Sequence, residues 1–164
     1  MLVTAVVFWQ IVLAVHIAAV VVAFGITFAY PLIGAAGSRM DARAMPWFHR
    51  VQDLIGKRLI SPALLIVVIA GIYLASELHQ WHTFYVQWGL GAAIVLGGLG
   101  GAYFGPKERK LAELAERDIE ASGGREVQWS DEYLALNRQV AIVGALSSLL
   151  VLVTIYFMTV QTGA

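Results

Sequence analysis

The stretch Leu2–Ala36, LVTAVVFWQIVLAVHIAAVVVAFGITFAYPLIGAA, decides the fold. It contains no Asp, Glu, Lys or Arg, and the only side chain in it that titrates near neutral pH is His16. A run of this length and composition is too apolar for a soluble core helix and is long enough to cross a bilayer. The sequence therefore predicts a membrane-spanning helix here. We expect it to be retained, because it lacks the basic segment that opens a signal peptide.

Three further apolar segments return across the bilayer. The four expected crossing helices are residues 4–30, 59–78, 84–104 and 131–160. The third continues to residue 120 as a charged amphipathic helix, and a short interfacial helix over residues 46–57 opens with Pro46 in its first turn. The chain is 59% hydrophobic and 13% charged, whereas a soluble domain is about a quarter charged. The expected fold is a single all-α domain over residues 1–164, a four-helix transmembrane bundle.

Two signals bound the loop before the last helix. Gly123-Gly124 is expected to end the charged helix. Ser130, followed by Asp131 and Glu132, is typical of a helix start.

The basic residues predict the orientation in the membrane. Five of the eleven Lys and Arg lie in residues 39–58 and six in residues 107–138. The positive-inside rule assigns both loops to the cytoplasm, and it places both termini and the 77–83 link outside. Zero net charge argues against nucleic acid as a partner. The absence of cysteine excludes disulfides and thiolate metal sites.

His16 is the one titratable group well inside the hydrocarbon, about 10 Å below the outer interface. An ionisable residue at this depth is a functional candidate. Ala19 and Ala23 on the same face leave space for a flat ligand, which makes His16 a candidate ligand of haem b. The alternative is a neutral imidazole bonded to a carbonyl or hydroxyl group of a neighbouring helix. Three hydroxyls of the fourth helix could serve: Ser147, Ser148 and Thr154.

The outer link holds a second candidate site. Glu77, His79 and His82 are side chains that can bind Cu(II) or Zn(II), and the alternative is an ordinary polar loop. A haem shared by His16 and one of these histidines would require the link to fold inward. His49 lies on the cytoplasmic side and cannot join His16.

Gly97, Gly101 and Gly105 are spaced by four in the third crossing. In lipid, small residues at this spacing let helix backbones approach closely. The glycines indicate packing within the chain or, alternatively, a seam for a partner subunit or a second copy.

Several segments resemble a bacterial family of four-helix integral membrane proteins of unknown function. They are VHIAAVVVAFG around His16, KRLISPALLIVVIAGIYL, FYVQWGLGAAIVLGGLGGAYFGPKERKLAELAE and LNRQVAIVGALSSLLVLVTIYFMTV. The pattern is also similar to the membrane domain of copper-resistance protein D and to J-type protoporphyrinogen oxidase. By that resemblance, His16 matches a histidine implicated in haem or metal binding, and Pro62 and Gly71 match a second-helix signature. The oxidase carries a lysine in its third helix, whereas positions 83–106 contain none.

Three functional hypotheses follow for a protein of the bacterial inner membrane. The first is a non-catalytic subunit or helper of a larger membrane complex, held by the glycine face and the charged helix, with no catalytic residue of its own. The second is a b-type haem or quinone-linked redox protein that uses His16. The third is copper or zinc handling at the outer face.

Overall fold

The computed structural model describes residues 8–161, and within them the chain forms helices and turns but no strand. The α-helices are α1 (Phe8–Phe24), α2 (Tyr30–Met40), α3 (Met45–Ile55), α4 (Ser61–Glu77), α5 (Phe84–Gly98), α6 (Gly105–Ala121) and α7 (Asp131–Val160). The 3-10 segments η1 (Gly25–Phe28) and η2 (Ala42–Ala44) and the π-helical turns η3 (Gly56–Ile60) and η4 (Leu99–Phe104) complete the order.

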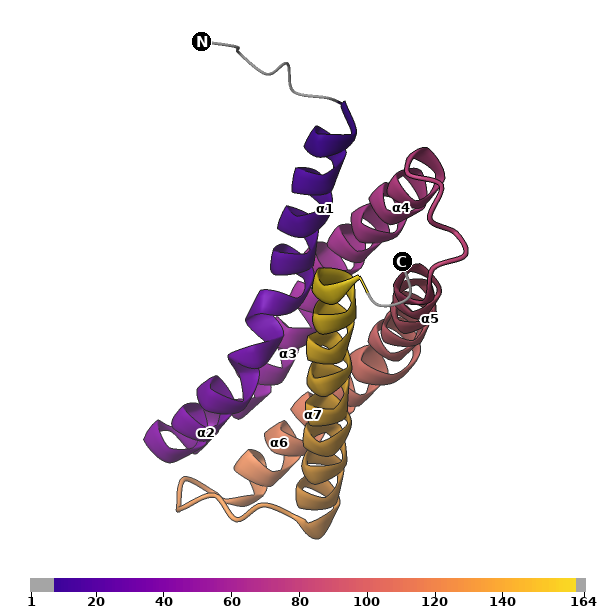
Figure 1. Cartoon of the computed structure of the whole chain (residues 1–164). Coiled ribbons are helices and arrows are strands. Elements are labelled where there is room, and N and C mark those ends of the chain that lie inside the picture. Colours follow the sequence, from indigo (N-terminus) through magenta and orange to yellow (C-terminus); the bar gives the residue numbers. More distant parts are fainter. Residues whose placement is uncertain (1–7, 162–164) are drawn as a thin grey trace.

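These elements combine into four long helical runs (Figure 1). The runs are Phe8–Met40, Ala42–Glu77, Phe84–Ala121 and Asp131–Val160, and each is long and apolar enough to cross a membrane. The prediction of an all-α, four-helix transmembrane bundle is thereby confirmed, and the chain is a multi-pass membrane protein. The expected start of the first helix, residues 4–7, lies outside the described residues.

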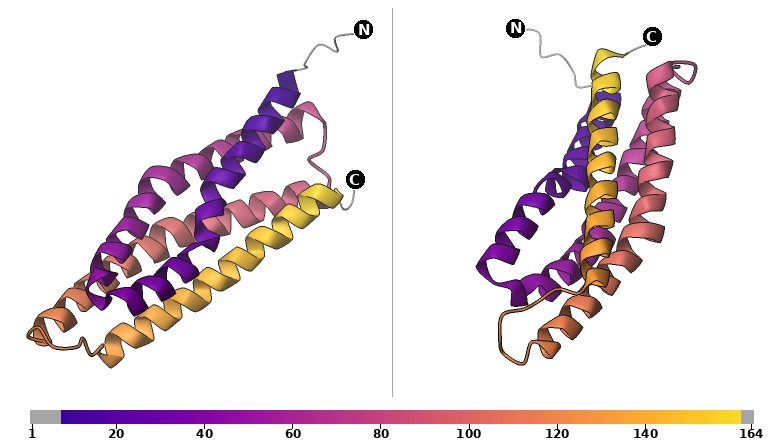
Figure 2. Two further views of the ribbon diagram at one scale, coloured as in Figure 1. Left: turned by 90° about the vertical axis from the view of Figure 1, so that its left-hand side faces the viewer. Right: turned by 90° about the horizontal axis from the view of Figure 1, so that it is seen from below.

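The four runs associate in pairs. α1 packs along α4, and α5 packs along α7. In Figure 2 (left), the part of the α1–α4 pair nearest the start of α1 lies above the α5–α7 pair. The start of α1, the end of α7 and the α4–α5 link all lie at one end of the molecule (Figure 1). At the opposite end α3 packs against α6, and α6 also contacts α7. We call this the basic end, because all eleven Lys and Arg belong to the segments that form it.

The buried apolar core lies at the basic end. Its members come from α3, α6 and α7, and they are Met45, Leu111, Leu114, Ala115, Tyr133 and Val140. Several of the residues buried along the crossings are alanines instead: Ala19, Ala23, Ala63, Ala70 and Ala92. Small residues at helix contacts bring backbones close together in lipid. Small side chains therefore form much of the contact between the crossings, together with a few larger buried ones such as Leu74, Tyr85 and Val151.

Residues 46–57 do not form a separate helix. They belong to α3 and the start of η3, and they run without a break into α4. Pro46 stands in the first turn of α3, as expected. However, α3 buries Met45, Pro46 and His49, whereas Trp47 is 67% exposed.

The glycines of the third run do not form one continuous contact. A Cβ added at Gly97 would lie 3.4 Å from Leu64 Cδ2, and one at Gly105 would lie 3.3 Å from Asp53 Oδ1. Nothing lies within 4 Å of a Cβ added at Gly101.

Candidate functional sites

His16 of α1 is held against α4. Its Nδ1 atom lies 3.0 Å from the carbonyl oxygen of Val67. Since a carbonyl oxygen only accepts hydrogen bonds, Nδ1 must carry the hydrogen, and Nε2 of the neutral ring keeps its lone pair. Metal-binding histidines are commonly fixed in this way, with one ring nitrogen donating to a carbonyl and the other left for the metal.

The surroundings of His16 are small and apolar. A Cβ added at Gly71 of α4 would lie 3.3 Å from the Cε1 atom of His16, so the imidazole rests directly on the helix backbone. The hydroxyls of Ser147 and Thr154 donate to carbonyl groups within α7, each at 2.8 Å. Of the partners considered from the sequence, a backbone carbonyl therefore orients the ring, and these two hydroxyls do not.

The link between α4 and α5 keeps Glu77, His79 and His82 exposed. Glu77 ends α4, and His79 and His82 follow in the turn before α5. His79 has a φ of 56°, a left-handed conformation that ends the helix. Within residues 8–161, no group of three or more His, Cys, Asp or Glu side chains is placed to hold a metal ion. A metal site at this link would require the three side chains to move together.

A buried polar cluster lies at the basic end and joins three helices. Nδ1 of His49 in α3 is 2.7 Å from Oε2 of Glu108 in α6, and Nε2 is 3.1 Å from the hydroxyl of Tyr133 in α7. Their exposed fractions are 2%, 5% and 3%, respectively. Gln52 donates to the same Glu108 oxygen at 3.5 Å. Both ring nitrogens of His49 therefore have partners, each on a different helix. We refer to these residues as the His49–Glu108–Tyr133 cluster.

The local sequence of α6 explains why an acidic residue is buried there. Glu108, Leu111, Ala115 and Asp118 recur at intervals of three or four residues, and all are buried. This is the spacing of one helix face, so the two acids extend the apolar stripe at both ends. Sequence analysis missed the cluster, although this spacing of Glu108 relative to Leu111 was a signal that could have revealed its inward orientation.

Asp118 connects the end of α6 to the start of α7. Its Oδ2 atom accepts hydrogen bonds from the backbone N–H and the hydroxyl of Ser130, both at 2.8 Å, and Ser130 is the N-cap of α7. Asp118 lies in the charged part of α6, beyond the apolar run. Burial by itself raises the pKa of Asp118, but the hydrogen bonds from Ser130 and Arg117 outweigh it and hold the pKa below its ordinary value.

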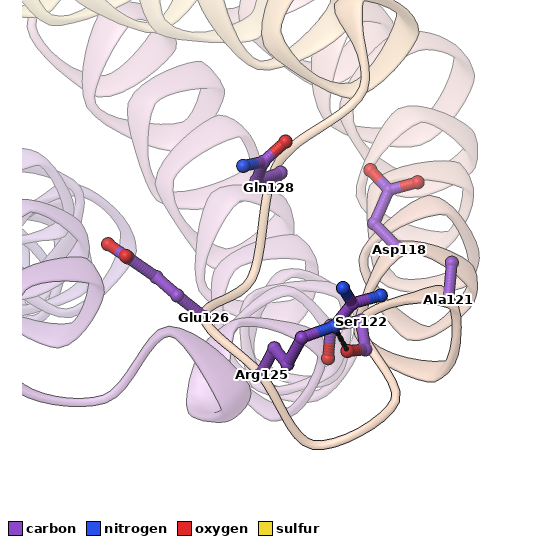
Figure 3. Close-up of a pocket in the computed structure, with 6 residues that line it drawn as sticks. All are labelled: Asp118, Ala121, Ser122, Arg125, Glu126 and Gln128. Carbon is purple, nitrogen blue, oxygen red and sulfur yellow. Dashed lines mark hydrogen bonds between the residues drawn. The ribbon is translucent and has the colours of Figure 1, made fainter.

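A polar hollow of about 310 Å³ opens beside Asp118, between the end of α6 and the following loop. Figure 3 shows the residues that line it, which are Asp118, Ala121, Ser122, Arg125, Glu126 and Gln128. Arg125 Nε donates to the carbonyl of Ser122 at 3.3 Å. The six residues include no histidine or cysteine, and the Asp118 carboxylate is engaged by Ser130. We therefore assign no chemistry to this hollow.

Fold and sites together define a small multi-pass membrane protein with one imidazole among its crossings and a buried polar cluster at its basic end. Comparison with protein-family models, with curated proteins and with solved structures gives no match for this chain. The function must therefore be inferred from the residues and geometry described above.

Proposed function

We propose that the protein is a non-catalytic subunit or helper of a larger membrane complex in the bacterial inner membrane. The observation that supports this is the distribution of burial. Large apolar side chains in every crossing remain exposed, for example Val21 at 64%, Leu65 at 60%, Ile94 at 69% and Leu146 at 61%. Lipid covers such side chains as well as a partner protein does. However, the crossings pack mainly in pairs, so each pair keeps helix faces on which the helices of a partner can pack.

The test is the size and composition of the native particle. The protein is extracted from its own membrane in polymer-bounded native nanodiscs, without detergent exchange, and its mass and partners are determined. We expect one larger complex of fixed composition, colourless and free of bound metal. A particle containing this chain alone, whether single or as a homo-oligomer, overturns the proposal.

We propose further that both termini face outward and both basic loops face the cytoplasm. This orientation is supported by the gathering of all eleven Lys and Arg at one end of the bundle. Because the chain has no native cysteine, single cysteines report their side without background. Gln80→Cys should react with an impermeant maleimide in intact cells, and Ala121→Cys should react only after lysis. If Ala121→Cys reacts in intact cells and Gln80→Cys reacts only after lysis, the orientation is the opposite of the one proposed.

A second candidate function is a b-type haem protein that uses His16. It is favoured by the bond from Nδ1 to Val67, which leaves Nε2 as the ligating atom, and by Gly71, whose missing side chain lets the ring lie close to α4. Haem would supply one-electron redox chemistry when bound, and the role of the chain would be to hold the iron and exclude water. The optical spectrum of the purified protein tests this. A Soret band should be lost in His16→Ala and kept in His79→Ala, and a colourless protein from haem-replete cells overturns it.

A further inference from the structure

We propose that the His49–Glu108–Tyr133 cluster is a buried proton-binding site that holds one proton at neutral pH. Its ligand is a single proton shared by the imidazole and the carboxylate. The inference does not depend on the proposed subunit role or on haem at His16.

The charges around the cluster support a shared proton. Within the described residues, His49 is the only basic side chain that forms an ion pair with Glu108. The nearby surface charges of α3 and α6 pair with one another instead: Arg50 with Glu116, and Lys57 and Arg109 with Asp53. Arg43 of η2 donates to the carbonyl of Arg125. If the pair holds one proton, it is neutral overall, and if it loses that proton a negative charge is left buried without a counter-charge, which is strongly unfavourable.

The hydrogen bonds allow the imidazole to be neutral or charged without losing a partner. Nδ1 of His49 donates to the Glu108 carboxylate in both states. In the neutral ring Nε2 accepts from the Tyr133 hydroxyl, and in the charged ring Nε2 donates to the same oxygen. A hydroxyl can do either, because it is both donor and acceptor. Proton uptake therefore requires only that the Tyr133 O–H rotates.

Two more buried tyrosine hydroxyls belong to the same end of the molecule as the cluster. The Tyr30 hydroxyl of α2 lies within electrostatic reach of Glu108, and Tyr103 of η4 packs on the same core. Both hydroxyls are buried and lack a hydrogen-bond partner within residues 8–161. Glu108 lies in the first turn of α6, directly after the π turn η4, and π turns in helices are frequent at functional sites.

The experiment counts the protons on the pair. The full-length protein is placed in lipid nanodiscs with ¹⁵N-histidine, which reports ring protonation at His49, and with ¹³C-glutamate, whose carboxyl stretch in the infrared reports Glu108. Single substitutions assign the signals. At pH 7 we expect one shared proton, seen as a doubly protonated ring with an ionised carboxylate or as a singly protonated ring with a protonated carboxyl. A singly protonated ring beside an ionised carboxylate at pH 7 overturns the proposal without any variant.

Two substitutions test the coupling. At pH 7, Glu108→Gln should leave the His49 ring singly protonated, because the counter-charge is gone. The matched control is Glu113→Gln, which neutralises an exposed acid on the same helix and should leave the His49 signal as in the wild type. If Glu108→Gln does not fold, His49→Gln serves instead, and a protonated Glu108 carboxyl is then expected at pH 7. A doubly protonated His49 ring in the first variant, or an ionised carboxylate in the second, refutes the shared proton.

Discussion

Tyr133→Phe removes one hydroxyl from the interior of the basic end and leaves the ring in place. The ring stacks on Trp129 with centroids 4.5 Å apart, so the packing persists while the 3.1 Å bond to Nε2 of His49 is lost. A buried polar atom deprived of its partner costs about 1–3 kcal/mol. We expect the free energy of unfolding to fall by that amount, because Tyr133 is only 3% exposed and water cannot replace the hydroxyl.

The assay is SDS-induced unfolding of the full-length protein in mixed micelles, followed by tryptophan fluorescence. Tyr156→Phe is the matched control, since that side chain is 58% exposed. This substitution should leave the free energy of unfolding almost unchanged. The decisive comparison repeats Tyr133→Phe in a His49→Leu background, where the hydroxyl has no imidazole to satisfy. The loss should then shrink by about 0.5 kcal/mol or more. Equal losses in both backgrounds would refute the coupling between the two side chains.

Two further predictions concern contacts elsewhere. Asp118→Ala leaves the N–H and hydroxyl of Ser130 without their acceptor and should lower the free energy of unfolding by about 1–3 kcal/mol. Because the folded pKa of Asp118 is lowered, this contribution should be fully present above the unfolded value of about 3.9. It should vanish as pH falls through the folded pKa, so wild type and variant should converge in acid. Gly71→Val should push on the His16 ring, 3.3 Å from the added Cβ, and destabilise by about 1–3 kcal/mol. Gly91→Val, with nothing within 4 Å, should have little effect in the same unfolding assay.

The bundle could be predicted because each of its determinants is local in the sequence. The uncharged run around His16 and the three later apolar runs identify four crossings on length and polarity alone. The two ends of the loop between α6 and α7 could be predicted from the sequence as well. Gly123 and Gly124 have φ values of 57° and 87°, and Ser130 caps α7 through the backbone N–H of Tyr133. Such signals require no knowledge of what packs against the segment.

The buried cluster could not be predicted in the same way, because it depends on which helix meets which. His49 and Glu108 are 59 positions apart, and each stands among charged neighbours that suggest a solvated surface. The orientation of α3 was equally hidden. Trp47 is exposed and His49 is inside, the reverse of what their hydrophobicity suggests, since Glu108 and Tyr133 supply the polar partners that the imidazole needs.

The two π turns determine which faces of the long helical runs point in the same direction before and after each turn. A π turn holds one residue more than an α turn, so everything beyond it is rotated by about 100° around the axis. η3 lies between α3, which packs against α6, and α4, which packs against α1. The π turn therefore sets the angle around the helix axis between these two contact faces. Deleting any one residue of Gly56–Ile60 would restore regular winding and turn His49 about a quarter of a revolution away from Glu108, although every side chain that touches either of them would be unchanged. In these two short segments the fold depends on the number of residues rather than on their chemistry.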